Sequence, residues 1–106
     1  MMRYTVDITP EAQDNISDEF NYIRARSPMS AAKWIRGLYR QIDSLELMPS
    51  RFGAAREQAY FEEDLRQLVY KSRRIIYLID ENRRYVDVLY VRHAKRRAIG
   101  EPEDES

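Results

Sequence analysis

Three short runs rich in apolar residues follow one another in the C-terminal half of the chain. The runs are LRQLVY at 65–70, RRIIYLI at 73–79 and YVDVLYV at 85–91, and short polar turns separate them. Branched and aromatic side chains dominate each run, and no 3.6-residue period links the apolar positions. The pattern therefore predicts three β-strands that form an antiparallel meander.

The N-terminal half predicts one strand and two helices. Residues 3–8 alternate between polar and apolar side chains, which is typical of a half-buried strand. Thr9-Pro10 and Ser27-Pro28 each combine a capping residue with a proline that fits the first helical position. Apolar residues then recur at spacings of three and four, which predicts one helix ending near Arg26 and a second ending at residues 48–50. The very short link between them predicts an antiparallel hairpin.

The predicted order is β-α-α-β-β-β, an α+β fold in which the N-terminal helical hairpin packs on one face of a mostly antiparallel sheet. We expect the other face to be partly open. Gly37 lies inside the second predicted helix, where a close approach between helices is one explanation for it. Residues 51–63 show no clear period and predict a loop, with a short strand or packed connector at 58–61. We place one domain at residues 1–98 and an acidic tail, predicted to be disordered, at residues 99–106.

Composition narrows the class of protein. The 106 residues are 43% hydrophobic and 34% charged, as expected for one globular domain, and the absence of cysteine excludes disulfides and thiolate metal sites. We find no signal peptide and no apolar run of the roughly 20 residues that a membrane span needs, so we expect a cytoplasmic protein. The net charge is zero, but residues 64–97 carry ten Lys and Arg against four Asp and Glu. This excess fits either a solvated sheet surface or a surface for an acidic partner.

Several segments, in this order, resemble the RelE/ParE superfamily of toxins from bacterial type II toxin–antitoxin systems, also called plasmid stabilisation proteins. The opening Y-x-V-x-I-T-P-E-A, from Tyr4, resembles the first strand and helix start of the family. The segment MPSRFG at 48–53 resembles the loop after the helical hairpin. The most specific segments are LRQLVY at 65–70, RIIY at 74–77 and VLYVRHAKR at 88–96. The resemblance runs from Tyr4 to Arg97.

The resemblance implies a growth-inhibiting toxin that a cognate antitoxin neutralises by direct contact, in a toxin–antitoxin hetero-oligomer. ParE-like members bind and block DNA gyrase, whereas RelE-like members enter the ribosome and cleave mRNA, so fold alone leaves open whether the chain is an enzyme. The neutral net charge and the long helical hairpin favour the ParE-like activity. A non-toxic relic that still binds its antitoxin is a third alternative. No metal or organic cofactor is implied.

If the chain is a nuclease, a base, an acid and a cation must surround the scissile phosphate. The resemblance places these roles on basic and aromatic side chains of the sheet and of the C-terminal end. The candidate catalytic residues are Arg66, Arg74, Tyr77 and His93. Each also has a structural interpretation, since Tyr77 lies mid-strand, both arginines can pair with nearby acids such as Asp64, and His93 can bond the backbone.

If the chain instead inhibits gyrase, it needs a binding surface and no catalytic group. The exposed basic end of the last strand is the predicted surface for the target or partner. Its residues are Arg92, Lys95, Arg96 and Arg97.

Overall fold

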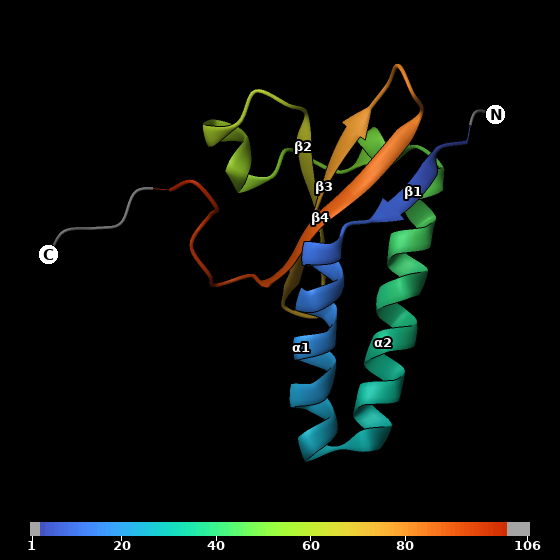
Figure 1. The fold of residues 1–106 in the computed structure, drawn as a ribbon, viewed down its shortest axis with the longest axis vertical. Helices are drawn as coiled ribbons and strands as arrows, with labels where there is room; N and C mark the ends of the chain where they lie inside the picture. Colours follow the sequence, from blue (N-terminus) through green and yellow to red (C-terminus); the bar gives the residue numbers. More distant parts are fainter. Residues whose placement is uncertain (1–2, 102–106) are drawn as a thin grey trace, which may run out of the picture.

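The computed structural model describes residues 3–101, in which two long helices lie against a four-stranded sheet (Figure 1). The elements are β1 (Thr5–Ile8), α1 (Pro10–Arg26), α2 (Pro28–Asp43), β2 (Leu65–Tyr70), β3 (Arg73–Asp80) and β4 (Tyr85–His93). The strand order is β1-β4-β3-β2, and only the β1–β4 pair is parallel. The predicted order of elements and the mostly antiparallel sheet are thus confirmed. Within these residues, neither helix combines the length and the apolar content that crossing a membrane requires.

Each helix begins at its predicted cap. The Ala12 amide donates to Thr9 Oγ1 at 3.2 Å, and the Ser30 amide donates to Ser27 Oγ at 3.2 Å. Ser27 also follows the end of α1, where its own amide donates to the Ile23 carbonyl at 2.8 Å. Because one residue separates the helices, they form an antiparallel hairpin, whose tip projects beyond the sheet (Figure 1).

The helix α2 ends earlier than its apolar stripe predicts. It ends at Asp43, and a short 3₁₀ helix at Ser44–Glu46 follows it. Leu45 is fully buried in this tighter turn, so the apolar stripe continues beyond the end of the α-helix. Two more 3₁₀ helices, at Pro49–Arg51 and Arg56–Tyr60, lead to β2. The sequence predicted either a short strand or a packed connector at residues 58–61, and the second of these helices is the packed connector.

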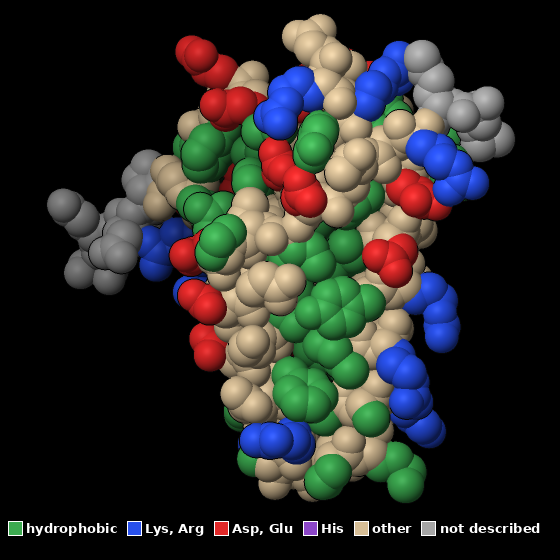
Figure 2. All heavy atoms as spheres, turned by 45° about the vertical axis from the view of Figure 1, so that its right-hand side comes forward, with side chains coloured by type: hydrophobic (Ala, Val, Ile, Leu, Met, Phe, Trp, Pro, Cys, Tyr) green, Lys and Arg blue, Asp and Glu red, His purple; other side chains and the backbone are tan. Residues whose placement is uncertain are grey.

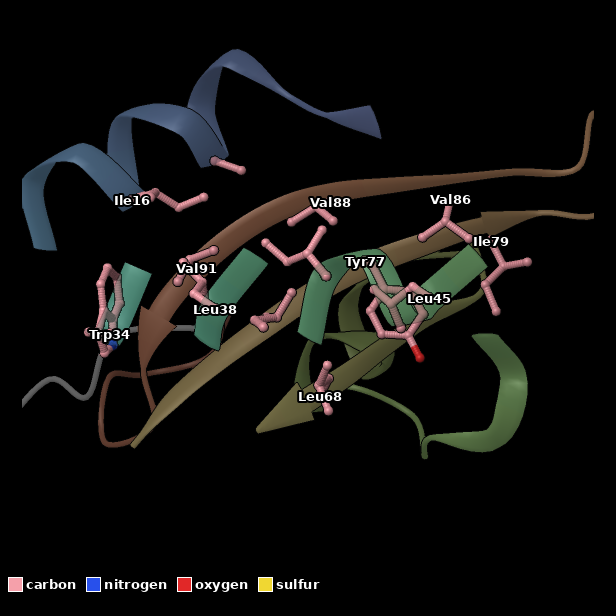
Figure 3. Close-up of a cluster of buried hydrophobic side chains, with 13 residues drawn as sticks. Ile16, Trp34, Leu38, Leu45, Leu68, Tyr77, Ile79, Val86, Val88 and Val91 are labelled. Carbon is pink, nitrogen blue, oxygen red and sulfur yellow. The ribbon is translucent and has the colours of Figure 1, made fainter. Parts of the chain in front are cut away.

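The helical hairpin covers one face of the sheet and encloses the main core (Figure 3). Ile16 of α1 and Leu38 of α2 belong to the same buried cluster as Tyr77 of β3 and Val88 of β4. The β-bulge between β3 and β4 shifts the register after Ile76. The main core accounts for most of the apolar periodicity of the sequence.

A smaller cluster lies on the opposite face of the sheet. Leu65 of β2 and Ile76 of β3 pack with Ala55, and Ile99 borders them. Successive side chains of a strand point to opposite faces, so Ile76 and its neighbour Tyr77 belong to different clusters. The connector before β2 and the segment after β4 therefore cover part of the face that we expected to be partly open. Of the predicted tail, residues 102–106 lie outside the described residues.

Gly37 lies against a strand residue. A Cβ atom at Gly37 would lie 2.0 Å from the Tyr70 hydroxyl oxygen and 2.8 Å from the ring carbon that bears it. The Tyr70 hydroxyl donates to the Trp34 carbonyl at 3.2 Å. A close approach of β2 to α2, and not of the two helices to each other, therefore explains this glycine.

This contact predicts that Gly37→Ala lowers the free energy of unfolding by about 1 kcal/mol. Overpacking against Tyr70 costs about 1–3 kcal/mol, which exceeds the gain of about 1 kcal/mol from alanine in a helix. In a Tyr70→Ala background the same change should stabilise the protein by about 1 kcal/mol, because only the helix propensity remains. Urea denaturation of the four proteins measures this coupling. An equal effect of Gly37→Ala in both backgrounds would contradict the packing argument.

Candidate functional site

The end of β4 and the basic segment after it form a concavity of about 350 Å³. It is lined by Arg92, Arg96, Arg97, Ala98 and Glu101. Arg92 Nη2 donates to the Arg97 carbonyl at 3.1 Å. Burial, and then the nearby charge of Arg96, lower the pKa of the Arg92 guanidinium. The structure thus brings three of the four predicted binding residues together, and it places the fourth, Lys95, exposed on the turn beside them.

Contacts from the connector before β2 hold this basic segment in place. Arg56 Nη2 donates to the Ala94 carbonyl and, at 3.3 Å, to the Arg96 carbonyl. The Ile99 amide donates to Glu57 Oε2 at 3.0 Å. The segment is therefore fixed through its backbone, which leaves the side chains of Lys95 and Arg96 exposed.

Arg74 is buried and forms an ion pair with Glu57. Its Nη1 and Nη2 donate to Glu57 Oε1 and Oε2 at 2.7 and 2.9 Å, and 1% of each residue is exposed. Nη1 also donates to Gln67 Oε1 at 3.0 Å. Burial raises the pKa of Glu57, but the hydrogen bonds from Arg74 and from the Ile99 amide outweigh it, so the pKa of this carboxyl is lowered. Both terminal nitrogens of the guanidinium are therefore engaged inside the protein.

Tyr77 and Arg66 hold the loop after the hairpin against the sheet. The Tyr77 side chain is fully buried, and its hydroxyl donates to the Pro49 carbonyl at 2.6 Å. Burial raises the pKa of Tyr77 to about 12. Arg66 Nη1 donates to the Phe52 carbonyl at 2.7 Å, and Arg66 Nε lies 3.2 Å from Asp64 Oδ1. The sequence predicted that Arg66 is either catalytic or paired with a nearby acid such as Asp64, and the structure contains that pair.

The four candidate nuclease residues do not converge on one site. Arg66 is the direct strand partner of Tyr77 on the helix-covered face, whereas Arg74 lies on the opposite face. His93 ends β4, and its Nδ1 accepts a hydrogen bond from the Lys95 amide at 3.1 Å. These four side chains therefore do not surround one open phosphate position. Residues 3–101 also contain no cluster of three or more Asp, Glu or His side chains that could hold a metal ion.

Two residues that organise this region could not be identified from the sequence. Arg56 and Glu57 lie in the stretch without periodicity, and their partners are far along the chain. A different signal was available for α2, since Lys33, Arg36 and Arg40 are its charged residues before Asp43 and all three are basic.

The comparisons with known proteins agree with this architecture. Residues 6–98 match the family model described as ParE toxin of type II toxin–antitoxin system, parDE. No curated protein sequence gives a significant match.

Three solved structures are similar in fold. A chain of the chromosomal ParDE toxin–antitoxin system from P. aeruginosa has 14% identity and a TM-score of 0.70, over 88% of this chain and 98% of that chain. A chain of the RelBE2 complex from Mycobacterium tuberculosis has 24% identity and a TM-score of 0.57, over 90% and 97%. A chain of the archaeal RelE–RelB complex from Pyrococcus horikoshii OT3 has 17% identity and a TM-score of 0.60, over 91% and 100%. At these identities, the similarity extends to the fold alone.

Proposed function

Because this chain belongs to the ParE toxin family of type II toxin–antitoxin systems, we propose that it stops growth by binding and inhibiting DNA gyrase. Inhibition of this kind requires a surface rather than a catalytic group. The concavity of Arg92, Arg96 and Arg97, with Lys95 beside it, is the surface that we assign to the target. A gyrase inhibitor acts in the cytoplasm, where we expect the protein.

One observation favours gyrase inhibition over mRNA cleavage. Arg74 and Tyr77, which a nuclease would direct at RNA, are 1% and 0% exposed and lie on opposite faces of the sheet. An RNA phosphate could reach Arg74 only after the ion pair with Glu57 had opened. A binding mode leaves these contacts intact, so it needs no rearrangement of the core.

We also propose that a cognate antitoxin neutralises the chain by direct contact. The similar structures come from complexes or systems that contain an antitoxin. Figure 2 shows hydrophobic side chains along the hairpin between α1 and α2. Phe20, Ile23, Ile35 and Tyr39 are partly buried residues of the two helices. An amphipathic antitoxin segment that covers this stripe would bury it.

The test is induced expression without antitoxin in cells that carry a DNA-damage reporter, with primer extension on cellular mRNA. We expect growth arrest with early DNA damage and intact mRNA, together with inhibition of supercoiling by purified gyrase. Lys95→Gln/Arg96→Gln should weaken inhibition at least about tenfold, because each lost contact to an acidic surface is worth about 1 kcal/mol or more.

Arg24→Gln/Arg26→Gln is the matched control, since it removes two exposed charges from α1 and should leave inhibition unchanged. Cleaved mRNA without early damage would instead assign the RelE-like nuclease activity. Normal growth, with supercoiling unaffected, would identify a relic that retains only antitoxin binding.

A further inference from the structure

A second basic concavity, of about 340 Å³, lies between α2 and the turn that joins β2 to β3. Lys33, Arg36 and Arg40 approach it from the helix, and Lys71 approaches it from the turn. Its lining includes Tyr70 but no acidic and no aliphatic side chain. Figure 2 shows Lys and Arg side chains along one edge of the hairpin. This concavity is separate from the basic segment after β4, with which it shares no residue.

The three helix cations have no counter-charge in the described structure. Lys33, Arg36 and Arg40 are exposed, and none of their side chains makes a hydrogen bond or an ion pair within residues 3–101. Their spacings of three and four residues place them on neighbouring turns of one helix face, where like charges repel and destabilise a helix. An anion in the concavity would relieve this repulsion.

The turn residue Lys71 occupies a strained backbone conformation. Lys71 and Ser72 have φ angles of 43° and 65°, in the left-handed region that L-residues rarely adopt. Hairpin turns of this kind usually carry Asn-Gly. The Lys71 ammonium lies 5.7 Å from the centre of the Tyr70 ring, and the Tyr70 hydroxyl is bonded to the Trp34 carbonyl of α2. The turn is therefore fixed against the helix with its cation beside the other three.

The chemistry of the lining indicates the kind of ligand. A docked peptide usually places an apolar anchor at the centre of its site, and this lining offers no aliphatic contact for one. Phosphate groups require only cations. Lys33 to Arg40 spans about 10 Å of α2, and one strand of duplex DNA carries a phosphate about every 3.4 Å, so about three phosphates match this length.

We propose that this concavity binds the phosphodiester backbone of duplex DNA, so that the toxin contacts gyrase and its DNA together. The choice of duplex DNA rests on the proposed function, because gyrase holds DNA as a duplex. The contact is independent of base sequence, since the lining reaches phosphates and not base edges. It adds a second surface to the one assigned to gyrase.

The test measures binding of the full chain to a fluorescent 20-base-pair duplex of arbitrary sequence, without gyrase, at 50 and 200 mM salt. With four phosphate contacts, the wild-type association constant should fall about 150-fold over this range, since each contact contributes about −0.9 to the logarithmic salt slope. Arg36→Gln/Arg40→Gln should bind more weakly at 50 mM and fall only about 12-fold. The control Arg24→Gln/Arg26→Gln, with the same change in charge, should retain the wild-type slope.

Equal salt slopes for the two double variants would overturn the proposal. So would equal binding to a single-stranded RNA of the same length, and so would a loss confined to antitoxin affinity, which would assign the concavity to an acidic protein segment. Circular dichroism of both variants is the control for folding. Gyrase supercoiling is assayed separately, so failure of inhibition with intact DNA binding would reject the proposed function and not this site.

Discussion

Glu57→Ala is expected to lower the free energy of unfolding by about 3–5 kcal/mol, because it leaves the Arg74 guanidinium buried without its counter-ion. Two hydrogen bonds, at 2.7 and 2.9 Å, join the side chains in a bidentate pair. Domains of this size are typically stable by about 5–15 kcal/mol, so the loss is a large share of the total. The same carboxylate accepts the Ile99 amide, which ties the segment after β4 to the sheet.

Urea denaturation of purified variants measures this effect. Glu63→Ala is the matched control, since it removes an exposed carboxylate from the stretch between that connector and β2 and should change stability by less than about 0.5 kcal/mol. Replacing both partners, as in Glu57→Leu/Arg74→Met, should recover most of the loss, because an apolar pair leaves no buried charge. Similar losses from Glu57→Ala and Glu63→Ala would show that the buried pair contributes no more than a surface charge.

The pair also sets a dependence on pH. The pKa of Glu57 is lower in the folded protein than its ordinary value of 4.5. Its contribution to stability is therefore fully present above pH 4.5 and is lost as the pH falls through the lower folded value. The Glu57→Leu/Arg74→Met variant lacks this contribution, so its stability should fall less than that of the wild type between pH 5 and pH 3.

The starts of both helices and the turn between β2 and β3 were predictable because local chemistry specifies them. Thr9 and Ser27 cap the helices through contacts three residues away, and the Lys71–Ser72 turn joins strands that pair directly. Information of this kind lies within a few residues of the chain. The alternation of polar and apolar side chains in residues 3–8 likewise predicted the half-buried strand β1.

The candidate site was less predictable because its contacts are long-range. Arg74 pairs with a residue 17 positions away in a stretch without periodicity, and the sequence suggested closer acids. The covering of the second sheet face depends in the same way on Ala55 and Ile99, which meet only in the folded chain. Motif resemblance therefore identified the family correctly, whereas the roles of single arginines required their actual partners.

Tyr77 distinguishes gyrase binding from mRNA cleavage most sharply. It is a structural core residue in the first mechanism and a catalytic residue in the second. In the structure its ring lies in the main core (Figure 3). Its hydroxyl donates to the Pro49 carbonyl at 2.6 Å. We expect Tyr77→Ala to lower the free energy of unfolding by about 3–5 kcal/mol, because it leaves a cavity in that core. Tyr77→Phe should cost about 1–3 kcal/mol, since only the hydrogen bond to a buried carbonyl is lost.

The decisive comparison is therefore between stability and toxicity. Thermal unfolding by circular dichroism gives the stability of Tyr77→Phe, and growth arrest on induction without antitoxin gives its toxicity. We expect a folded protein that still arrests growth, because the target surface after β4 does not include the Tyr77 hydroxyl. A folded Tyr77→Phe variant without toxicity, beside a toxic wild type, would instead mean that the hydroxyl acts in the reaction. Such a result would require the loop at Pro49 to open on the target, and the mRNA-cleaving activity would then be the better account of this chain.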